Sequence, residues 1–237
     1  MALTKTKIEW CDFSTNPIKG YCPVGCPYCY ARRMYDRFHW DKTIRLDDHA
    51  MAMAILGIEH LKKPSRIFVG STIELFGEWV KPEWLKEIFI LARVYTQHIF
   101  IFLTKQPQNL QKWSPFPQNC YIGVSVTNYS QFHHALDGLQ GISARVKFIS
   151  FEPLQELFSV TRVVTTKRFD ICFGLQDLDW LIIGAETGNR KGKPPLSQVQ
   201  NWAREIIKVA DEAGIPCFTK DNLKLPANEV RREFPNG

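Results

Sequence analysis

Three cysteines near the N-terminus have the spacing of a metal-binding loop. Cys22, Cys26 and Cys29 are separated by three and then two residues, within a candidate cluster loop at residues 20–31. Thiolates bind soft metals, and structural zinc sites usually take four ligands. The nearest further thiol is Cys11, eleven positions before Cys22. A four-iron four-sulfur (4Fe-4S) cluster on three thiolates keeps one iron open for a substrate or cofactor, so we favour that cluster, with a four-cysteine zinc site as the alternative.

The cysteine count and the composition describe a soluble globular chain without a disulfide framework. The chain has 237 residues, of which 45% are hydrophobic and 23% charged, and seven are cysteines. An odd number of cysteines argues against a full set of disulfides. We expect the three scattered ones to be buried thiols: Cys120, Cys172 and Cys217.

Charge and hydropathy indicate a cytoplasmic protein with no membrane partner. The 30 Lys and Arg residues exceed the 24 Asp and Glu residues by six, which permits an anionic partner without requiring one. No apolar run approaches the about 20 residues of a membrane helix, and residues 1–7 lack the apolar core of a signal peptide.

Short apolar runs alternate with amphipathic patterns along the chain. Near-continuous apolar runs are typical of parallel strands that are buried on both faces. We predict six such strands and a possible seventh, at residues 66–70, 99–103, 121–124, 146–149, 180–183 and 215–218, and at 17–21. Helices are predicted to begin after Asp47 and Asp48, at Pro82, and at Ser197 as a cap, the last helix ending at Gly214.

This β-α alternation predicts an α/β fold with a parallel sheet. With six strands the sheet would form a partial TIM-type barrel, (β/α)6-like, rather than a full eight-unit barrel. We predict a single domain over residues 1–237. Residues 159–179 fit neither the helical nor the strand period, and we predict an insertion there.

Polar side chains follow the ends of the predicted strands. The carboxyl ends of parallel strands form the face where substrates and cofactors bind. Any strand must end near polar residues, but charged ones that directly follow buried strands need a further reason. We predict that five residues line one site, with Ser125 binding the cofactor and the others catalytic: Lys105, Ser125, Glu152, Glu186 and Lys220.

The motif CPVGCPYCYA at residues 22–31 resembles the CxxxCxxC loop of the radical S-adenosylmethionine (SAM) superfamily. Further blocks in order are similar to an uncharacterised, phage-associated branch of that superfamily: RIFVGSTIELF, LTKQP, NCYIGVSVTN, FISFEPL and DWLIIGAETG. The match spans about residues 7–220. The resemblance implies a partial barrel that binds SAM and a 4Fe-4S cluster. It also implies reductive cleavage of SAM to methionine and a 5'-deoxyadenosyl radical, which abstracts a hydrogen atom from the substrate.

The resemblance also implies individual roles. Cys22, Cys26 and Cys29 would each hold one iron, and SAM would chelate the fourth. Tyr28 matches the aromatic position that contacts the adenine. In that superfamily, a sequence motif binds the SAM amino group. The residues at its position in this chain are Gly70, Ser71 and Thr72. The reduction requires an electron donor such as flavodoxin or ferredoxin.

A basic loop follows the strand predicted at residues 180–183. It carries Arg190, Lys191 and Lys193 and is a candidate phosphate clamp, the alternative being a solvated loop. The run CPYCY at residues 26–30 resembles a DNA-repair member of the same superfamily. We therefore predict a nucleic acid or nucleotide as substrate. The alternative from another functional class is a non-catalytic nucleic-acid-binding protein with a structural zinc on Cys11 and the three loop cysteines.

Overall fold

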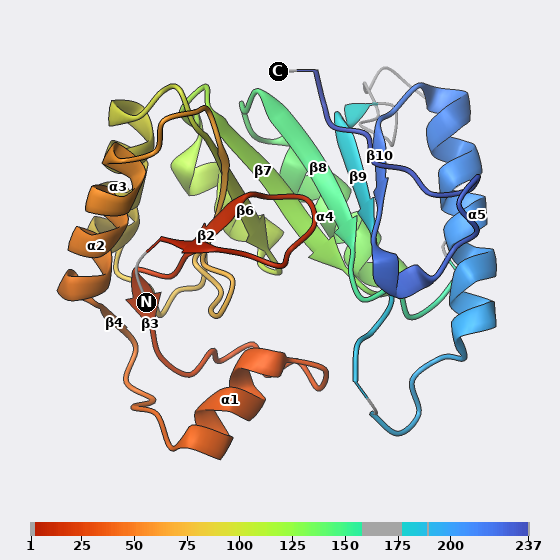
Figure 1. Cartoon of the computed structure of the whole chain (residues 1–237), viewed down its shortest axis with the longest axis horizontal. Coiled ribbons are helices and arrows are strands. Elements are labelled where there is room, and N and C mark those ends of the chain that lie inside the picture. The colour runs from red at the N-terminus through yellow and green to blue at the C-terminus, as the bar shows by residue number, and fades with distance from the viewer. Residues whose placement is uncertain (1–2, 158–176, 189, 237) are drawn as a thin grey trace. The chain divides into compact units, whose positions relative to one another are not determined.

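A computed structural model of the chain describes residues 3–157, 177–188 and 190–236 (Figure 1). Most of the insertion predicted at residues 159–179 lies outside this range, as does Cys172. The chain divides into two compact units, one formed by residues 1–122 with 143–145 and the other by residues 123–142 with 146–237. In both, strands alternate with helices and the central strands are parallel, so the predicted α/β class is confirmed.

The first unit contains four strands of the main sheet. In spatial order they are β1 (Thr4–Lys5), β2 (Phe13–Thr15), β5 (Arg66–Val69) and β6 (Ile99–Thr104). β1 pairs with β2 in antiparallel fashion, whereas the pairs β2–β5 and β5–β6 are parallel. The helices of this unit are α1 (Tyr30–Phe38), α2 (Asp48–Glu59), α3 (Pro82–Val94) and the 3-10 helix η1 (Pro107–Trp113).

The strand predicted at residues 17–21 is not part of this sheet. Ile18–Lys19 forms β3, which pairs with β4 (Arg45–Leu46) in a separate two-stranded antiparallel sheet. The first parallel strand of the main sheet is instead β2, which the sequence did not reveal. Its three residues, Phe-Ser-Thr, are too few and too polar to form an apolar run.

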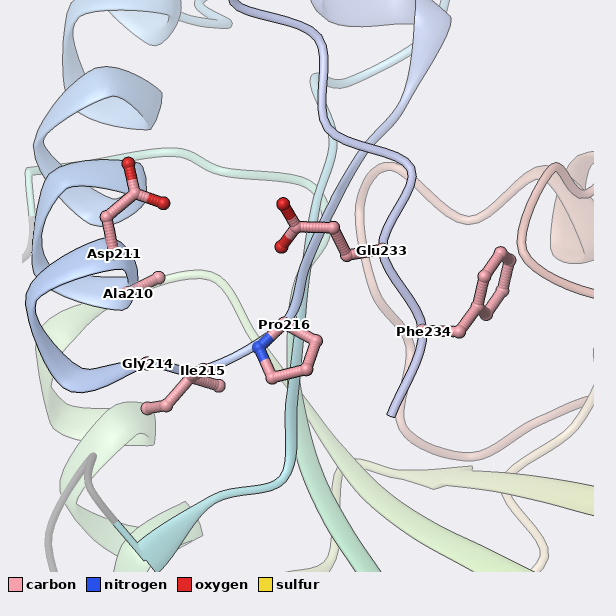
Figure 2. Close-up of a pocket in the computed structure, with 7 residues that line it drawn as sticks. All are labelled: Ala210, Asp211, Gly214, Ile215, Pro216, Glu233 and Phe234. Atoms are coloured by element: carbon pink, nitrogen blue, oxygen red, sulfur yellow. The ribbon is translucent and has the colours of Figure 1, made fainter. Parts of the chain in front are cut away.

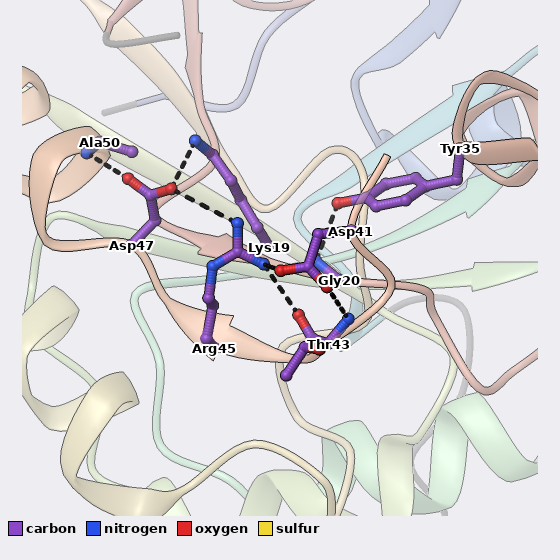
Figure 3. A network of polar contacts seen from close by, with 8 residues as sticks. All are labelled: Lys19, Gly20, Tyr35, Asp41, Thr43, Arg45, Asp47 and Ala50. Atoms are coloured by element: carbon purple, nitrogen blue, oxygen red, sulfur yellow. Dashed lines mark hydrogen bonds and ion pairs between the residues drawn. The ribbon is translucent and has the colours of Figure 1, made fainter. Parts of the chain in front are cut away.

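Asp47 links the β3–β4 sheet to helix α2 (Figure 3). Its carboxylate accepts hydrogen bonds from the Lys19 ammonium at 2.8 Å and from the Ala50 N–H at 2.7 Å, the second of which caps the helix. The Lys19 bond is the main reason why the pKa of Asp47 lies below its ordinary value of 3.8. The predicted helix start is therefore confirmed, with Asp47 as the cap.

We expect Asp47→Ala to lower the free energy of unfolding by about 1–2 kcal/mol, because it removes a helix cap and an ion pair. A carboxyl group with a lowered pKa stabilises the fold above pH 3.8, and this contribution is lost as the pH falls through the lowered pKa. Urea unfolding at several pH values should show the deficit near pH 7 and its disappearance in acid. The control is Asp48→Ala, which removes an exposed neighbour and should cost about 0.5 kcal/mol. A deficit that persists unchanged in acid would contradict this role.

The second unit contains the remaining strands. β7 (Cys120–Val126) contains the division between the two units, which falls after Ile122. β8 (Val146–Phe151), β9 (Trp180–Ile183) and β10 (Cys217–Thr219) pair in parallel in that order. The helices are α4 (Tyr129–Gln140), α5 (Leu196–Ala213) and the 3-10 helix η3 (Asp221–Leu223). An aromatic core of Phe148, Trp180, Phe218 and Phe234 packs inside this unit, with ring centroids 5.2–6.5 Å apart.

The ends of α5 differ in part from the prediction. The helix begins at Leu196 with Pro195 as its N-cap, so Ser197 lies in the first turn and is not the cap. No side chain caps the N-terminus of this helix. The helix ends at Gly214, as predicted, and this glycine has the left-handed conformation. Within the described residues, no helix has the length and apolar character that crossing a membrane requires.

Candidate functional site

The cysteine loop follows β3, the short strand after β2 in the chain, and runs into α1. Cys29 is the N-cap of that helix, and its N–H donates to the Cys26 carbonyl at 3.1 Å. The Arg32 guanidinium, one turn into α1, donates to the Cys22 carbonyl at 2.5 Å. All three thiols of the loop are half-buried. The loop is therefore fixed by backbone contacts, and its thiols remain accessible for ligation.

Gly20 fixes the point at which the loop starts. Its φ is +127°, and a Cβ there would lie 2.6 Å from the Ile44 Cα, so only glycine fits. The Gly20 N–H donates to the buried Tyr35 hydroxyl at 2.8 Å. This contact joins the start of the loop to helix α1 (Figure 3).

The surroundings of Cys22 favour its protonated thiol. Burial raises the pKa of the Cys22 thiol, and negative charge at Glu74 and Cys26 raises it further, against backbone hydrogen bonds from Glu74 and Val24. A metal that binds Cys22 must displace this proton, so binding there depends on pH. By their chemistry, three thiols on one loop suit a soft metal centre.

The side chains of the loop are not drawn together around a metal position. In the described part of the chain, no three His, Cys, Asp or Glu side chains gather closely enough to hold one metal ion. Cys11 is buried, and its thiol lies 3.8 Å from the Ile8 carbonyl oxygen.

The segment Gly70–Thr72 is held against the cysteine loop. Asn16, which follows β2, accepts hydrogen bonds from the Ser71 hydroxyl, the Thr72 N–H and the Thr72 hydroxyl, each at 3.1 Å. The Tyr30 hydroxyl donates to the Ser71 carbonyl at 3.1 Å. The predicted cofactor-binding segment therefore lies next to the predicted cluster loop within the first unit.

Lys105 lies close to Tyr28. Its ammonium is 5.5 Å from the centroid of the Tyr28 ring, a cation–π distance. The position of Lys105 depends on Glu74, whose carboxylate accepts from the Lys105 N–H at 2.6 Å and from the Thr104 hydroxyl at 2.7 Å. The Phe76 N–H is a third donor, at 2.9 Å.

The sequence analysis did not identify two residues that hold these side chains in place, Asn16 and Glu74. Asn16 follows a strand too short to recognise, so nothing marked it as a strand-end residue. Glu74 was visible as a polar residue after the β5 run, but its place as a buried acceptor for three donors depends on tertiary structure. Burial raises the pKa of Glu74 above its ordinary value of 4.5, although the three donors oppose that shift.

The second unit gathers the other predicted residues at the carboxyl ends of its strands. Lys220, after β10, forms an ion pair with Glu152, after β8. The Ser125 hydroxyl, from β7, donates to the Glu152 carbonyl at 3.1 Å. A Cβ on Gly184 would lie 3.0 Å from the Lys220 Cδ and 3.3 Å from the Glu152 Cδ, so glycine leaves the space that the pair occupies.

Glu186 is engaged by its own loop. Arg190 donates two hydrogen bonds of 2.7 Å to its carboxylate and Gln155 donates one of 2.9 Å. The Arg190 bonds are the main reason why the pKa of Glu186 is lowered. Lys193 donates to the Gly188 carbonyl, and Lys191 is exposed. Of the three predicted phosphate-clamp cations, Arg190 is thus held by a carboxylate within the loop.

A pocket of about 370 Å³ in the second unit is not this site (Figure 2). It is lined by the end of α5, the residues before β10 and the C-terminal segment, including Asp211, Pro216 and Glu233. It therefore lies at the amino end of β10, whereas Lys220 follows its carboxyl end.

Residues 5–233 match the model of the family described as protein of unknown function (DUF5131). The chain belongs to this family. A search of curated proteins finds no match for this DUF5131 chain.

Solved structures of spore photoproduct lyase, a radical SAM enzyme, resemble this DUF5131 protein. Two of its single-substitution variants give TM-scores of 0.60 and 0.61 at 11% and 12% identity, each over 92% of this chain and 78% of theirs. A variant with bound AdoMet and dinucleoside spore photoproduct gives 0.53 at 12% identity, over 86% of this chain and 64% of its own. At these identities the likeness shows a common fold, and the predicted partial parallel barrel is thereby confirmed.

Proposed function

We propose that this DUF5131 protein is a radical SAM-type enzyme. One observation carries the proposal. A loop with three cysteines lies in the segment between the first parallel strand, β2, and helix α1, in a fold that is shared with a radical SAM enzyme. We propose that Cys22, Cys26 and Cys29 hold a 4Fe-4S cluster and that SAM binds beside it.

The residues of the first unit fit the two cofactors. The thiols offer ligands, Tyr28 an aromatic face, and Gly70, Ser71 and Thr72 a carbonyl and two hydroxyls on a segment held against the loop. When bound and reduced, the cluster supplies the electron that cleaves SAM to methionine and a 5'-deoxyadenosyl radical. Lys105 places a positive charge beside Tyr28 and would orient a carboxylate there.

In the second unit, we propose that Glu152 and Lys220 face the substrate. Lys220 can donate a proton from its ammonium and Glu152 can accept one at its carboxylate, and Ser125 fixes the backbone of Glu152. Glu186, with Arg190 bound to it, would shape the loop that follows β9.

The cluster can be tested on the whole chain. We expect anaerobic reconstitution with iron and sulfide to give a brown protein with about four irons and four sulfides per chain. A colourless protein that binds one zinc tightly and takes up no iron would contradict the proposal and support the zinc alternative.

We propose a nucleic acid or nucleotide as the substrate class. Supporting this, the loop after β9 carries two cations outside the Glu186 pair, and the neighbouring enzyme has been solved with a dinucleoside bound. We expect Lys191→Ala/Lys193→Ala to weaken binding of a DNA oligonucleotide and to lower the slope of log K against log salt by about 1.5–2. Lys62→Ala/Lys63→Ala, which neutralises an exposed pair before β5, is the control. An unchanged slope in the first variant would refute the phosphate clamp.

The proposed reaction consumes one electron for each SAM that is cleaved. We therefore propose that a flavodoxin or a ferredoxin supplies it.

A further inference from the structure

An aromatic and basic surface lies on α1 and the turn after it. It consists of Arg33, Arg37, Phe38, Trp40 and Lys42, and is here named the α1 patch. Phe38 is 51% exposed and Trp40 is 41% exposed, yet the two rings stack with centroids 5.6 Å apart. Large aromatic side chains that remain in water together mark a contact surface more often than isolated ones do.

The α1 patch is held in place by the protein backbone. His39 ends α1 with a φ of +50°, which is uncommon for a residue other than glycine. The turn lets the Trp40 N–H donate to the Tyr35 carbonyl at 3.1 Å and brings the Trp40 ring edge-on to Tyr35, at 5.3 Å. Tyr35 in turn binds Gly20 at the start of the cysteine loop. The exposed rings are therefore ordered before any partner arrives, which lowers the cost of binding.

The α1 patch lies in a segment with an excess of positive charge. Residues 30–45 carry five Arg and Lys against two Asp, a net of three out of the six for the whole chain. Asp36 and Asp41 are paired with Lys42 and Arg45. In the described part of the chain, no ion pair joins Arg33 or Arg37 to a carboxylate, and both are exposed. A surface of this sign attracts an acidic partner over a distance.

The α1 patch also lies close to the cysteine loop. Helix α1 starts directly after Cys29, and Phe38 is nine residues further along. At 1.5 Å per residue, that is about 14 Å of helix. A protein docked on the patch would thus approach the thiols without entering the site that the loop serves.

We propose that the α1 patch is the docking surface for an acidic one-electron carrier protein. The inference rests on the proposed function, since only a redox centre at the cysteines gives such a carrier a role. Redox encounters use small interfaces and charge steering, which suits five residues of this kind. A nucleic acid is less favoured, because base stacking needs open ring faces and Phe38 already has Trp40 stacked on it and Arg37 within 5.4 Å.

The test measures binding of flavodoxin to the full chain, in addition to activity. We expect Arg33→Glu/Arg37→Glu to slow association with flavodoxin by about tenfold or more at low salt, and to flatten the salt dependence. Lys62→Glu/Lys63→Glu makes the same change of charge before β5, at the amino ends of the strands, and should leave binding unchanged. Trp40→Ala keeps every charge and should speed dissociation without altering the salt dependence.

Activity separates this inference from the proposed function. With dithionite as reductant, Arg33→Glu/Arg37→Glu should form 5'-deoxyadenosine at the wild-type rate, and with reduced flavodoxin it should be slower by at least the binding defect. The proposed docking surface would be refuted if Arg33→Glu/Arg37→Glu and Lys62→Glu/Lys63→Glu slowed association with flavodoxin equally. It would also be refuted if the wild type did not bind flavodoxin. A loss of DNA binding in Arg33→Glu/Arg37→Glu with flavodoxin binding intact would refute it as well. A wild type that forms no 5'-deoxyadenosine even with dithionite would instead count against the proposed function.

Discussion

Replacing Cys26 with alanine is expected to strip the reconstituted protein of its cluster. Cys26 lies between the other two thiols in the chain, and its carbonyl accepts the hydrogen bond that closes the loop at Cys29. The substitution keeps that backbone contact and removes only the thiolate. Losing a group that merely orients a ligand costs metal affinity about 10- to 100-fold, so we expect the loss of a ligand to cost more. Iron content and the visible absorbance of the cluster measure the effect.

Cys11→Ala is the matched control for Cys26→Ala. Cys11 belongs to the zinc alternative but not to the cluster, and its thiol already contacts the Ile8 carbonyl. We expect this variant to bind iron as the wild type does, at a cost in stability of about 1 kcal/mol. Full iron content in Cys26→Ala, or a loss of metal in Cys11→Ala equal to that in Cys26→Ala, would show that the ligands are assigned wrongly.

The second large effect is expected at Glu74. Glu74→Ala would leave three donors without their acceptor, of which the Thr104 hydroxyl is fully buried. Each buried donor without a partner costs about 1–3 kcal/mol, so we expect a loss of at least about 3 kcal/mol in the free energy of unfolding. Because Lys105 loses the contact that holds its backbone, formation of 5'-deoxyadenosine should fall as well. Urea unfolding and product assays measure the two effects, and Glu78→Ala, at an exposed neighbour, is the control.

Glu74→Gln adds a test through pH. Burial raises the pKa of Glu74, so the folded state binds its proton more tightly than the unfolded chain does. The contribution of Glu74 to stability is then complete below its ordinary pKa of 4.5, and it is lost as the pH rises through the raised pKa. Glutamine does not titrate. The free energy of unfolding of the wild type should therefore exceed that of Glu74→Gln most in acid, and this difference should narrow toward neutral pH. A difference that widens toward neutral pH would mean that the carboxylate is held ionised.

Most of the sheet could be predicted because its strands are apolar and long enough to recognise. β5, β6, β8 and β9 are buried over most of their length, and each begins at the residue where a predicted run begins. β2 could not be found, since three residues carry no period. The pairing of β3 with β4 joins residues 26 and 28 positions apart, Lys19 with Arg45 and Ile18 with Leu46, which local patterns do not encode.

The candidate site was predictable where the chemistry is local in the chain. The three thiols share one loop, and Glu152 and Lys220 follow their strands directly, so the sequence named them all. Asn16 and Glu74 both bind partners distant in the chain, up to 56 residues away for Thr72 and Asn16. Arg190 was predicted to bind substrate from its charge alone, whereas its bonds to Glu186 require the folded loop.

The most direct test of the proposed function is the fate of SAM. The reconstituted wild-type protein is reduced with dithionite under anaerobic conditions and incubated with SAM, and the products are quantified by mass spectrometry. The proposal predicts methionine and 5'-deoxyadenosine in equal amounts, dependent on the cluster and absent from Cys26→Ala. Intact SAM after incubation with a protein that holds its full complement of iron would contradict it.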